Sequence, residues 1–393
     1  MPAESLRFEI AEYMSRLRLT RSAMDAAGVD VLIVTDPSNM YWLTGYDGWS
    51  FYVPQCIVIT QGESPLWFGR QMDANGAKRT VYMDDSCLNW FEDHFVQSDE
   101  RHPMSVLAKL IQDKGWAAAN IGVEMDNVYF TAKGYQVLTA ALPSARFKDT
   151  TRLVKWQRII KSPKEIEYMR AAGQIVSAMH ERIGEVLRPG SKQSDVVAEI
   201  YHTGTKGVGD LWGDYPAGAP QIGAGADASA PHLTWTDRKL DVGESIFFEL
   251  AGVYKRYHVP LSRTYHIGKP VQKFVEAEKA IIEGMEVGLE NSIVGNTCED
   301  VAKAYYAVVE KHGLSKPSRA GYSVGVAYPP DWGEHTASIR LGDKTVLQPG
   351  MTFHFMSGLW MGDWGIEITE SILITEAGPE CLSTIPRRLF TIE

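Results

Sequence analysis

The chain has 393 residues, of which 45% are hydrophobic and 22% are charged, and its formal net charge is −10 at pH 7. This length suits two domains with full cores, and the composition is ordinary for a globular protein. The acidic balance argues against nucleic acid and against an anionic membrane surface as partners, whereas a small zwitterionic or cationic substrate is compatible with it.

The spacing of the cysteines and the lack of long apolar runs indicate in which cellular compartment the protein works. The four cysteines, Cys56, Cys87, Cys298 and Cys381, are far apart and form no Cys-x-x-Cys pattern, so we expect a reducing, cytoplasmic environment. The N-terminal sequence MPAESLRFEIAEYMSRL has no apolar core region, so we expect no signal peptide. No run reaches the roughly 18 apolar residues of a membrane-spanning helix, so no membrane partner is expected.

The N-terminal part of the chain alternates predicted strands and helices. Apolar periodicity predicts a helix over residues 8–28 that ends at Gly28 and a second helix over residues 104–114. Asp36-Pro37 is expected to be a turn. Strands are predicted over residues 29–35, 56–60, 66–68 and 119–124, with a hairpin turn between the second and third. The alternation predicts a smaller α/β domain over residues 1–155.

A helix start marks the beginning of the second domain. Ser162 is expected to be an N-cap, with Pro163 at the first helical position and Glu165 completing a capping box. This helix is expected to run to Pro189-Gly190, and a second helix follows over residues 193–205. Residues 206–231 are rich in Gly, Pro and Ala and are predicted to be a long loop, which is typical of a functional segment.

The segment from Gly243 to Gly268 reads as a strand, a polar turn and a second strand. Its first strand is apolar except for one carboxylate, Glu249. Burying a carboxylate costs free energy unless a partner or a function compensates. Two interpretations stay open from the residues alone: a structural acid paired with a group such as Arg263, or a functional carboxylate.

The remaining elements are helices over residues 272–290 and 297–312, an irregular Gly/Tyr/Pro-rich segment over residues 318–334, and two strands. The strands are predicted over residues 351–356 and 365–375, and the second has clear period-two alternation.

Several motifs occur in the order found in one known family. They are KSPKEIEYMRAAGQI, Ala230-Pro231-His232, the SRTY and GYSVG segments, and the ending PGMTF…GIEITESILIT. The chain resembles the creatinase/prolidase/aminopeptidase P family over essentially its whole length. The resemblance implies an α/β protein whose smaller N-terminal domain precedes a C-terminal pita-bread domain over residues 156–393. The segments GYDGWSFYVPQ and GDYPAG resemble the members that open the cyclic amidine ring of ectoine, a compatible solute.

The resemblance also locates five positions that hold two divalent metals in the peptidases of the family. In those peptidases the five positions hold two Asp, one His and two Glu, and this chain has other residues at all five: Glu249, Pro260, Tyr322, Met356 and Thr369. Such a set lacks the several carboxylate or imidazole ligands that a hard-metal site needs. We therefore expect no catalytic metal and no other cofactor. The alternative of a new site built from His258, His266, His335 and His354 has no ligand spacing to support it.

Side-chain chemistry is then expected to carry the reaction. By resemblance, Glu249 attacks the amidine carbon or activates a water, and covalent attack is the favoured variant. His232 stands at the family's substrate-facing histidine position and is expected to protonate the leaving ring nitrogen, because imidazole exchanges protons near neutral pH. Without the resemblance, His232 reads as a surface or turn residue.

Substrate-binding residues are expected to be aromatic or acidic, because an aromatic face attracts a delocalised cation. The candidates are Trp49, Phe51 and Tyr52 in one loop, Asp214 and Tyr215 with their neighbour Trp212, and Tyr322, Trp235, Glu367 and Glu370. The resemblance implies a homodimer in which the loop of Trp49 completes the active site of the neighbouring subunit. A deacetylase that acts on the product is a further possible partner.

Three competing interpretations remain. The sequence Gly321-Tyr-Ser323-Val-Gly325 matches a serine nucleophile elbow, although the prolines that follow disfavour the helix such an elbow needs. A metal-free hydrolase of a guanidino compound is the second. The third is a non-catalytic binding module derived from a peptidase.

Overall fold

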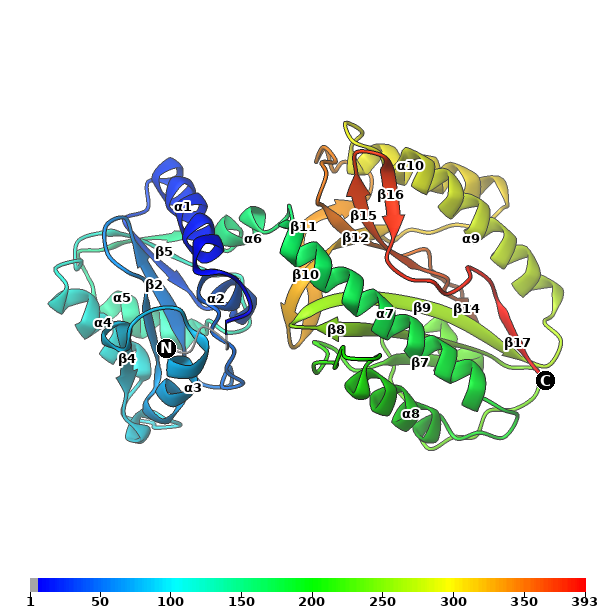
Figure 1. The fold of residues 1–393 in the computed structure, drawn as a ribbon, viewed down its shortest axis with the longest axis horizontal. Coiled ribbons are helices and arrows are strands. Elements are labelled where there is room, and N and C mark those ends of the chain that lie inside the picture. The colour runs from blue at the N-terminus through cyan, green and yellow to red at the C-terminus, as the bar shows by residue number, and fades with distance from the viewer. Residues whose placement is uncertain (1–5) are drawn as a thin grey trace. The chain divides into compact units, whose positions relative to one another are not determined.

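The computed structural model describes residues 6–393, and this part of the chain divides into two compact units (Figure 1). The first unit ends at Arg158 and the second begins at Ile159, slightly later than the boundary expected from the sequence. The expectation of no signal peptide concerns in part residues 1–5, which lie outside the described residues. Within residues 6–393, no helix is long and apolar enough to cross a membrane.

The N-terminal unit is built on a six-stranded sheet with the order β4-β3-β2-β1-β5-β6. Its strands are β1 (Val31–Val34), β2 (Cys56–Thr60), β3 (Leu66–Arg70), β4 (Leu88–Phe91), β5 (Asn120–Val123) and β6 (Arg146–Asp149). Its helices are α1 (Ile10–Ala27), α2 (Pro37–Thr44), α3 (Ala74–Thr80), α4 (Pro103–Asp113), α5 (Ala132–Ala141) and α6 (Leu153–Gln157). The β2–β3 hairpin and the mixture of strands and helices were predicted correctly.

Helix α2 was missed by the sequence analysis, which expected a turn at Asp36-Pro37. Asp36 is the N-cap of this helix, because its side chain accepts a hydrogen bond from the Ser38 backbone N–H at 2.9 Å. Pro37 occupies the first helical position, where a missing N–H carries no cost. The same two residues therefore start a helix rather than close a turn.

The C-terminal unit has the pita-bread fold, built on a nine-stranded sheet. Its main order is β16-β15-β12-β10-β9-β8-β7, with β11 beside β10 and β17 beside β9. The strands are β7 (Gln221–Ala224), β8 (Ser245–Tyr254), β9 (Tyr257–Ile267), β10 (Gly321–Tyr328), β11 (Asp331–Ile339), β12 (Thr352–Phe355), β15 (Glu370–Thr375), β16 (Gly378–Cys381) and β17 (Phe390–Ile392). A separate pair is formed by β13 (Leu359–Trp360) and β14 (Gly365–Ile366).

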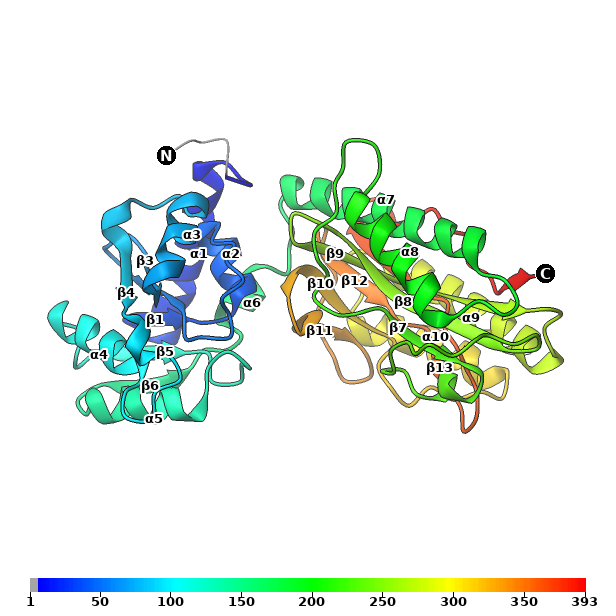
Figure 2. The same ribbon diagram turned by 90° about the horizontal axis from the view of Figure 1, so that it is seen from below.

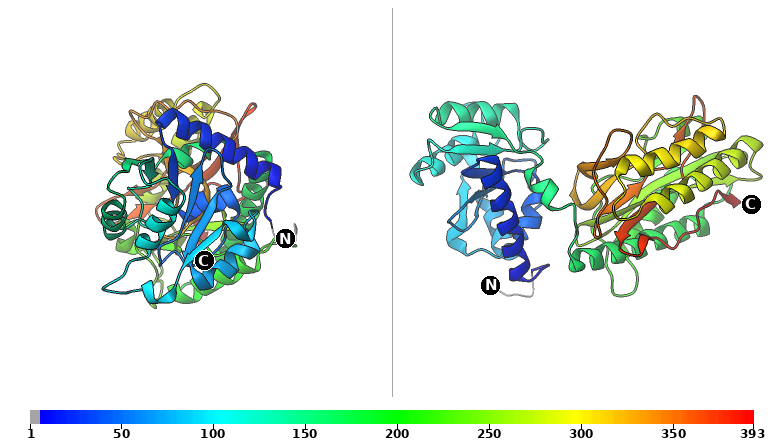
Figure 3. Two further views of the ribbon diagram at one scale, coloured as in Figure 1. Left: turned by 90° about the vertical axis from the view of Figure 1, so that its left-hand side faces the viewer. Right: turned by 90° about the horizontal axis from the view of Figure 1, so that it is seen from above.

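Helices of this unit pack in pairs along the sheet. Helix α7 (Pro163–Val186) lies beside α8 (Gln193–Lys206) and packs on β8 and β9 (Figure 2). Helices α9 (Gln272–Asn291) and α10 (Cys298–Lys311) lie side by side (Figure 3). The predicted capping box of α7 is confirmed.

The β8–β9 hairpin orders the middle of the C-terminal unit. Its turn residues Lys255 and Arg256 have φ values of 47° and 69°, the left-handed pair that suits the twist of a tight hairpin. Gly252 packs so closely on α7 that a Cβ at this position would meet the Ala172 carbonyl oxygen at 2.2 Å. Since successive strand residues face opposite sides, Glu249 points away from α7.

Three segments differ from the sequence-based expectation. The predicted loop over residues 206–231 contains β7, which pairs with β8, and the segment expected to be irregular contains β10 and β11. The predicted strand over residues 365–375 is divided into β14 and β15. Strand pairing decides these conformations: β7 pairs with β8, β10 pairs with β11 and β12, and β14 and β15 pair with different strands, β13 and β12. Local periodicity does not report such pairing.

Candidate active site

A cavity of about 490 Å³ opens on the side of β8 that faces away from α7. It collects side chains from β7, β8, β10, β11 and β13 and from the loops beside them. The lining residues are Gln221, Pro231, His232, Glu249, Ser318, Arg319, Tyr322, Asp331, Trp332, Met356 and Trp360. Glu249, His232 and Tyr322, three residues predicted from the sequence, are thus brought to one cavity.

Glu249 is the buried carboxylate of this cavity. Burial raises the pKa of Glu249 well above its usual value, and the nearby carboxylates of Glu367 and Asp331 raise it further, whereas Lys316 lowers it. Gln221 lies directly opposite Glu249 in the β7–β8 pairing. With the Gln221 amide nitrogen facing the acceptors, Nε2 donates to Glu249 Oε2 at 3.0 Å.

His232 lies in the loop that follows the short 3-10 turn Gly225–Ser229, and its side chain is exposed at the cavity. The same Gln221 Nε2 that donates to Glu249 also donates to the carbonyl oxygen of Pro231 at 3.1 Å. One amide therefore joins the buried carboxylate to the residue that precedes His232. This arrangement places a carboxylate and an imidazole on one cavity without a direct ion pair between them.

Behind the cavity lies a buried lysine. Lys316 Nζ donates to the Gly358 carbonyl oxygen at 2.7 Å and lies 4.5 Å from the centre of the Trp360 ring. Burial lowers the pKa of Lys316 to about 7. Trp360 Nε1 donates in turn to Glu367 Oε1 at 2.8 Å, and burial raises the pKa of Glu367 to about 7. Glu367, predicted to bind substrate, thus lies behind Trp360.

A chain of hydrogen bonds runs beside Glu249 through Tyr322 and His354. Tyr322 Oη lies 3.0 Å from His354 Nδ1 and accepts a hydrogen bond from Trp332 Nε1 at 2.8 Å. His354 Nε2 lies 2.8 Å from Thr369 Oγ1, and His354 Nδ1 lies 3.9 Å from Glu249 Oε1. Burial lowers the pKa of His354 to about 3, so its imidazole is neutral at physiological pH. The Tyr322 hydroxyl is therefore held in place by its hydrogen bonds with Trp332 and His354.

The donor set at the family's metal positions does not fit a pair of divalent metals. Glu249 is the one carboxylate among the five, and Thr369 Oγ1 is engaged with His354 and with the backbone N–H of Ser262. Pro260 offers only a carbonyl, which accepts a hydrogen bond from Ser371 Oγ at 2.6 Å. Such a set lacks the carboxylate and imidazole ligands of a hard-metal site.

The four histidines considered as an alternative site have separate partners. His258 Nε2 accepts from the Ala217 N–H at 2.9 Å, and His266 Nδ1 lies 2.8 Å from Ser245 Oγ. His335 Nε2 lies 2.6 Å from Asp331 Oδ2. Across residues 6–393, no three or more His, Cys, Asp or Glu side chains are grouped so that they could hold a metal ion.

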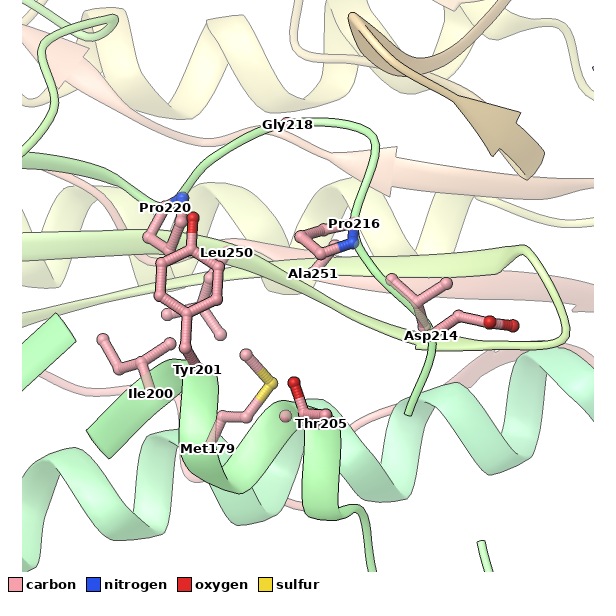
Figure 4. A pocket seen from close by; sticks show the side chains of 12 residues that line it. Met179, Ile200, Tyr201, Thr205, Asp214, Pro216, Gly218, Pro220, Leu250 and Ala251 are labelled. Carbon is pink, nitrogen blue, oxygen red and sulfur yellow. The ribbon is translucent and has the colours of Figure 1, made fainter. Parts of the chain in front are cut away.

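Asp214 and Tyr215 are not brought to the Glu249 cavity. Asp214 Oδ1 lies 3.5 Å from Arg256 Nη1, and the Arg256 guanidinium lies 3.8 Å from the centre of the Tyr215 ring. Asp214 also lines a small pocket beside α7 and α8, where its carboxylate is turned away from Tyr201 (Figure 4). These contacts hold the β8–β9 turn.

The other predicted aromatic residues are dispersed. Trp49, Phe51 and Tyr52 belong to the N-terminal unit, where Trp49 and Tyr52 are exposed and the Trp49 and Phe51 rings lie 4.9 Å apart. Trp212 packs on Tyr254, and Trp235 packs on Tyr201.

The structure excludes two alternatives that the sequence left open for neighbouring residues. Arg263 is fully buried and pairs with Glu370 at 2.5 Å, so it neither pairs with Glu249 nor reaches the cavity, and Glu370 has a structural partner. The competing serine nucleophile elbow, which the following prolines already disfavoured, is excluded, because Ser323 lies inside β10, is buried and lies 2.6 Å from Thr336 Oγ1. An elbow needs a strand-to-helix turn at the serine.

The sequence analysis missed Gln221 and Lys316 and considered His354 only as a metal ligand. Gln221 falls in a segment that was predicted to be a loop, and Lys316 precedes a proline in a segment without periodicity. His354 stands in the apolar strand β12, where a lone polar residue was the available signal.

Two family models match the chain. Residues 167–376 match metallopeptidase family M24, and residues 16–160 match the creatinase/prolidase N-terminal domain. The chain is 54% identical over 393 residues to an ectoine hydrolase of Halomonas elongata, and the match covers 98% of each chain. It is 24% identical to a probable dipeptidase, PepE, of Mycobacterium bovis, over 99% of each chain.

Solved structures share the fold. A prolidase from Thermococcus sibiricus has a TM-score of 0.85 at 17% identity, covering 98% of this chain and 100% of that one. A Xaa-Pro dipeptidase from Bacillus anthracis has a TM-score of 0.80 at 21% identity, covering 97% and 100%. At identities this low, the likeness concerns the fold alone, and it covers both units.

Proposed function

Because the chain belongs to metallopeptidase family M24 and carries the creatinase/prolidase N-terminal domain, we propose that it is a hydrolase that opens the cyclic amidine ring of ectoine. The observation that carries this proposal is Glu249, a buried carboxylate that shares its cavity with His232 where the peptidases hold metals. The ectoine hydrolase of Halomonas elongata supports the choice of substrate. Hydroxyectoine is a second candidate substrate.

Glu249 attacks the amidine carbon in this proposal. The protonated ring brings a positive charge to the carboxylate, and an opposite charge favours the ionised form that burial disfavours. A bond forms from a carboxylate oxygen to the carbon between the two ring nitrogens, and the electrons of the C=N bond move to nitrogen. The alternative role, in which Glu249 removes a proton from an attacking water, gives the same product.

His232 supplies the proton that the leaving nitrogen needs. As the ring C–N bond breaks, the leaving nitrogen keeps the electron pair, takes that proton and becomes an amine. Water then attacks the same carbon and releases the Glu249 carboxylate, so the net reaction adds one water across a C–N bond. The product is an N-acetyl-diaminobutyrate. No step uses a metal, because the five family positions offer one carboxylate and no imidazole.

Tyr322 and Glu367 complete the site in this proposal. Tyr322 offers its hydroxyl and ring at the cavity wall, and Glu367 lies behind Trp360, where its negative charge favours a cation in the cavity. Asp214 and Tyr215 are left out, because they contact Arg256.

The test is turnover by the full-length protein after dialysis against EDTA. Ectoine, hydroxyectoine and creatine are supplied separately, and mass spectrometry follows the ring-opened amide. We expect product from ectoine and none from creatine. Product from creatine alone would favour a guanidino hydrolase, and no product from any of the three would favour a binding module.

Covalent attack and general-base catalysis are separated by a second experiment. A structure of the intact protein soaked with ectoine is expected to show continuous density between a Glu249 oxygen and the ligand. Density for a water between them, with a normal non-bonded distance, would assign Glu249 the role of base.

We also propose a homodimer in which Trp49, Phe51 and Tyr52 of one subunit complete the site of the other, in a cytoplasmic enzyme whose product passes to a deacetylase. Trp49→Ala and Glu249→Gln proteins are each expected to lack activity. Subunits exchanged between the two variants should regain activity, because a mixed dimer then contains one intact site. Absence of complementation, with exchange verified by mass spectrometry, would place the loop in the site of its own chain.

A further inference from the structure

Arg319 is the one arginine or lysine among the described residues that line the Glu249 cavity. Its guanidinium lies 4.2 Å from the centre of the Tyr322 ring, and Nη1 donates to Ser338 Oγ at 3.4 Å. The side chain is exposed and forms no ion pair with a carboxylate of residues 6–393. It is a positioned cation that retains hydrogen-bonding capacity.

We infer that Arg319 binds the carboxylate of the substrate and thereby determines which way round the ring enters the cavity. The inference rests on the proposed function and extends it to the anionic end of a zwitterionic substrate. Guanidinium groups bind carboxylates through two parallel N–H donors, a geometry that fixes direction as well as position.

The distribution of charge in the cavity supports this orientation. Glu249 supplies negative charge, which suits the amidinium part of the ring, and Arg319 supplies positive charge for the carboxylate of the substrate. A zwitterion bound the other way round would place like charges together, which costs free energy. Arg319 therefore directs the amidine carbon toward Glu249.

Contacts link Arg319 to the catalytic carboxylate. The guanidinium packs on Tyr322, Tyr322 is hydrogen-bonded to His354, and His354 Nδ1 lies 3.9 Å from Glu249 Oε1. The cation–aromatic contact holds the guanidinium at the wall of the cavity, so less conformational freedom is lost when a carboxylate binds.

Other cations near the cavity are unsuited to this role. Arg263 is buried against Glu370 and four backbone carbonyls, and Arg256 packs on Tyr215 and Asp214. Lys316 lies behind Trp360 and does not line the cavity.

The experiment compares ectoine with the same methyl-substituted ring lacking the carboxylate. For Arg319→Met, we expect the KM for ectoine to rise about 10- to 100-fold, the loss expected for a charged hydrogen-bonded pair. The kinetic constants for the ring without a carboxylate should not change. Arg319→Lys should recover part of the loss, because lysine keeps the charge but not the paired donors. Arg340→Met, at an exposed arginine outside the cavity, is the matched control.

Equal losses with both compounds would overturn the inference, because Arg319 would then act on the structure of the site. So would an unchanged KM for ectoine. Calorimetry measures the affinity for ectoine of the Glu249→Gln protein with and without the additional Arg319→Met substitution. It therefore tests the Arg319 contact in the absence of turnover. If the unaltered protein hydrolyses neither compound while binding of ectoine still depends on Arg319, the proposed function fails and the inference stands. Binding that does not depend on Arg319 overturns the inference.

Discussion

Gln221 donates a hydrogen bond to Glu249 across the neighbouring strands β7 and β8, with 3.0 Å between Nε2 and Oε2. The same nitrogen donates to the carbonyl oxygen of Pro231, the residue before His232. Strand pairing therefore sets the position of the Glu249 carboxylate and of the His232 loop together. A hydrogen bond donated to the carboxylate also favours the ionised form of Glu249.

Replacing Gln221 with Leu is expected to lower kcat for ectoine roughly 10- to 100-fold, because a donor to a charged group is lost. Without that donor the pKa of Glu249 rises further, so the acid limb of the kcat/KM profile should move to higher pH. The measurement is steady-state kinetics across the pH range.

The matched control is Gln193→Leu. Gln193 Oε1 accepts a hydrogen bond from the Thr236 N–H at 2.9 Å, and so holds a later part of the same loop without lining the cavity. Equal losses in the two variants, with no change in the pH profile, would show that Gln221 acts only by anchoring the loop.

Replacing Glu249 with Gln is expected to nearly abolish turnover and to stabilise the fold. The pKa of Glu249 is raised in the folded state, so its contribution to stability is present below the unfolded pKa and is lost as pH rises through the folded pKa. Gln does not ionise. The variant should therefore gain Tm over the unaltered protein at about pH 8 and gain less at about pH 5.

Thermal unfolding at both pH values, together with an activity assay, checks this prediction. Glu376→Gln, an exposed residue between β15 and β16, should change neither quantity. Near-normal activity in Glu249→Gln would return Glu249 to the role of a structural core acid.

Much of the fold was predictable because local signals mark it. Glu249 was singled out as a lone carboxylate in an apolar strand, whereas His232 was proposed from the family resemblance. The capping box at Ser162 and Glu165 starts α7, and the short apolar run around Glu249 indicates β8. The supporting residues carry no such signal. Gln221 becomes significant only when β7 pairs with β8, and Lys316 only when tertiary packing buries it beneath Trp360. The sequence therefore predicts Glu249 and His232 as candidate reacting residues, but it does not predict the residues that hold them in place.

Metal removal is expected to leave activity unchanged. Dialysis against EDTA should alter neither kcat nor KM for ectoine, because Pro260, Met356 and Thr369 offer no carboxylate or imidazole. Metal content by mass spectrometry before and after dialysis is the necessary control. An activity that falls with metal content and returns on addition of Mn²⁺ or Zn²⁺ would contradict the prediction.

Lys316 is expected to control the pH dependence of the reaction. Its pKa is about 7, so it is positively charged mainly below that pH, where it favours the ionised form of Glu249. Replacement with Met removes this charge while Glu367 and Asp331 still disfavour ionisation. The value of kcat/KM for ectoine should then fall roughly tenfold near pH 6 and much less near pH 8.

The pH–rate profile of Lys316→Met distinguishes this effect from simple loss of packing. Its acid limb should move to higher pH, because the free enzyme then needs a higher pH to ionise Glu249. A general disturbance of the site would lower activity by the same factor at every pH. Lys311→Met, at an exposed lysine of α10, serves as the control and should leave the profile unchanged. An acid limb that stays in place in Lys316→Met would show that the lysine charge does not act on Glu249.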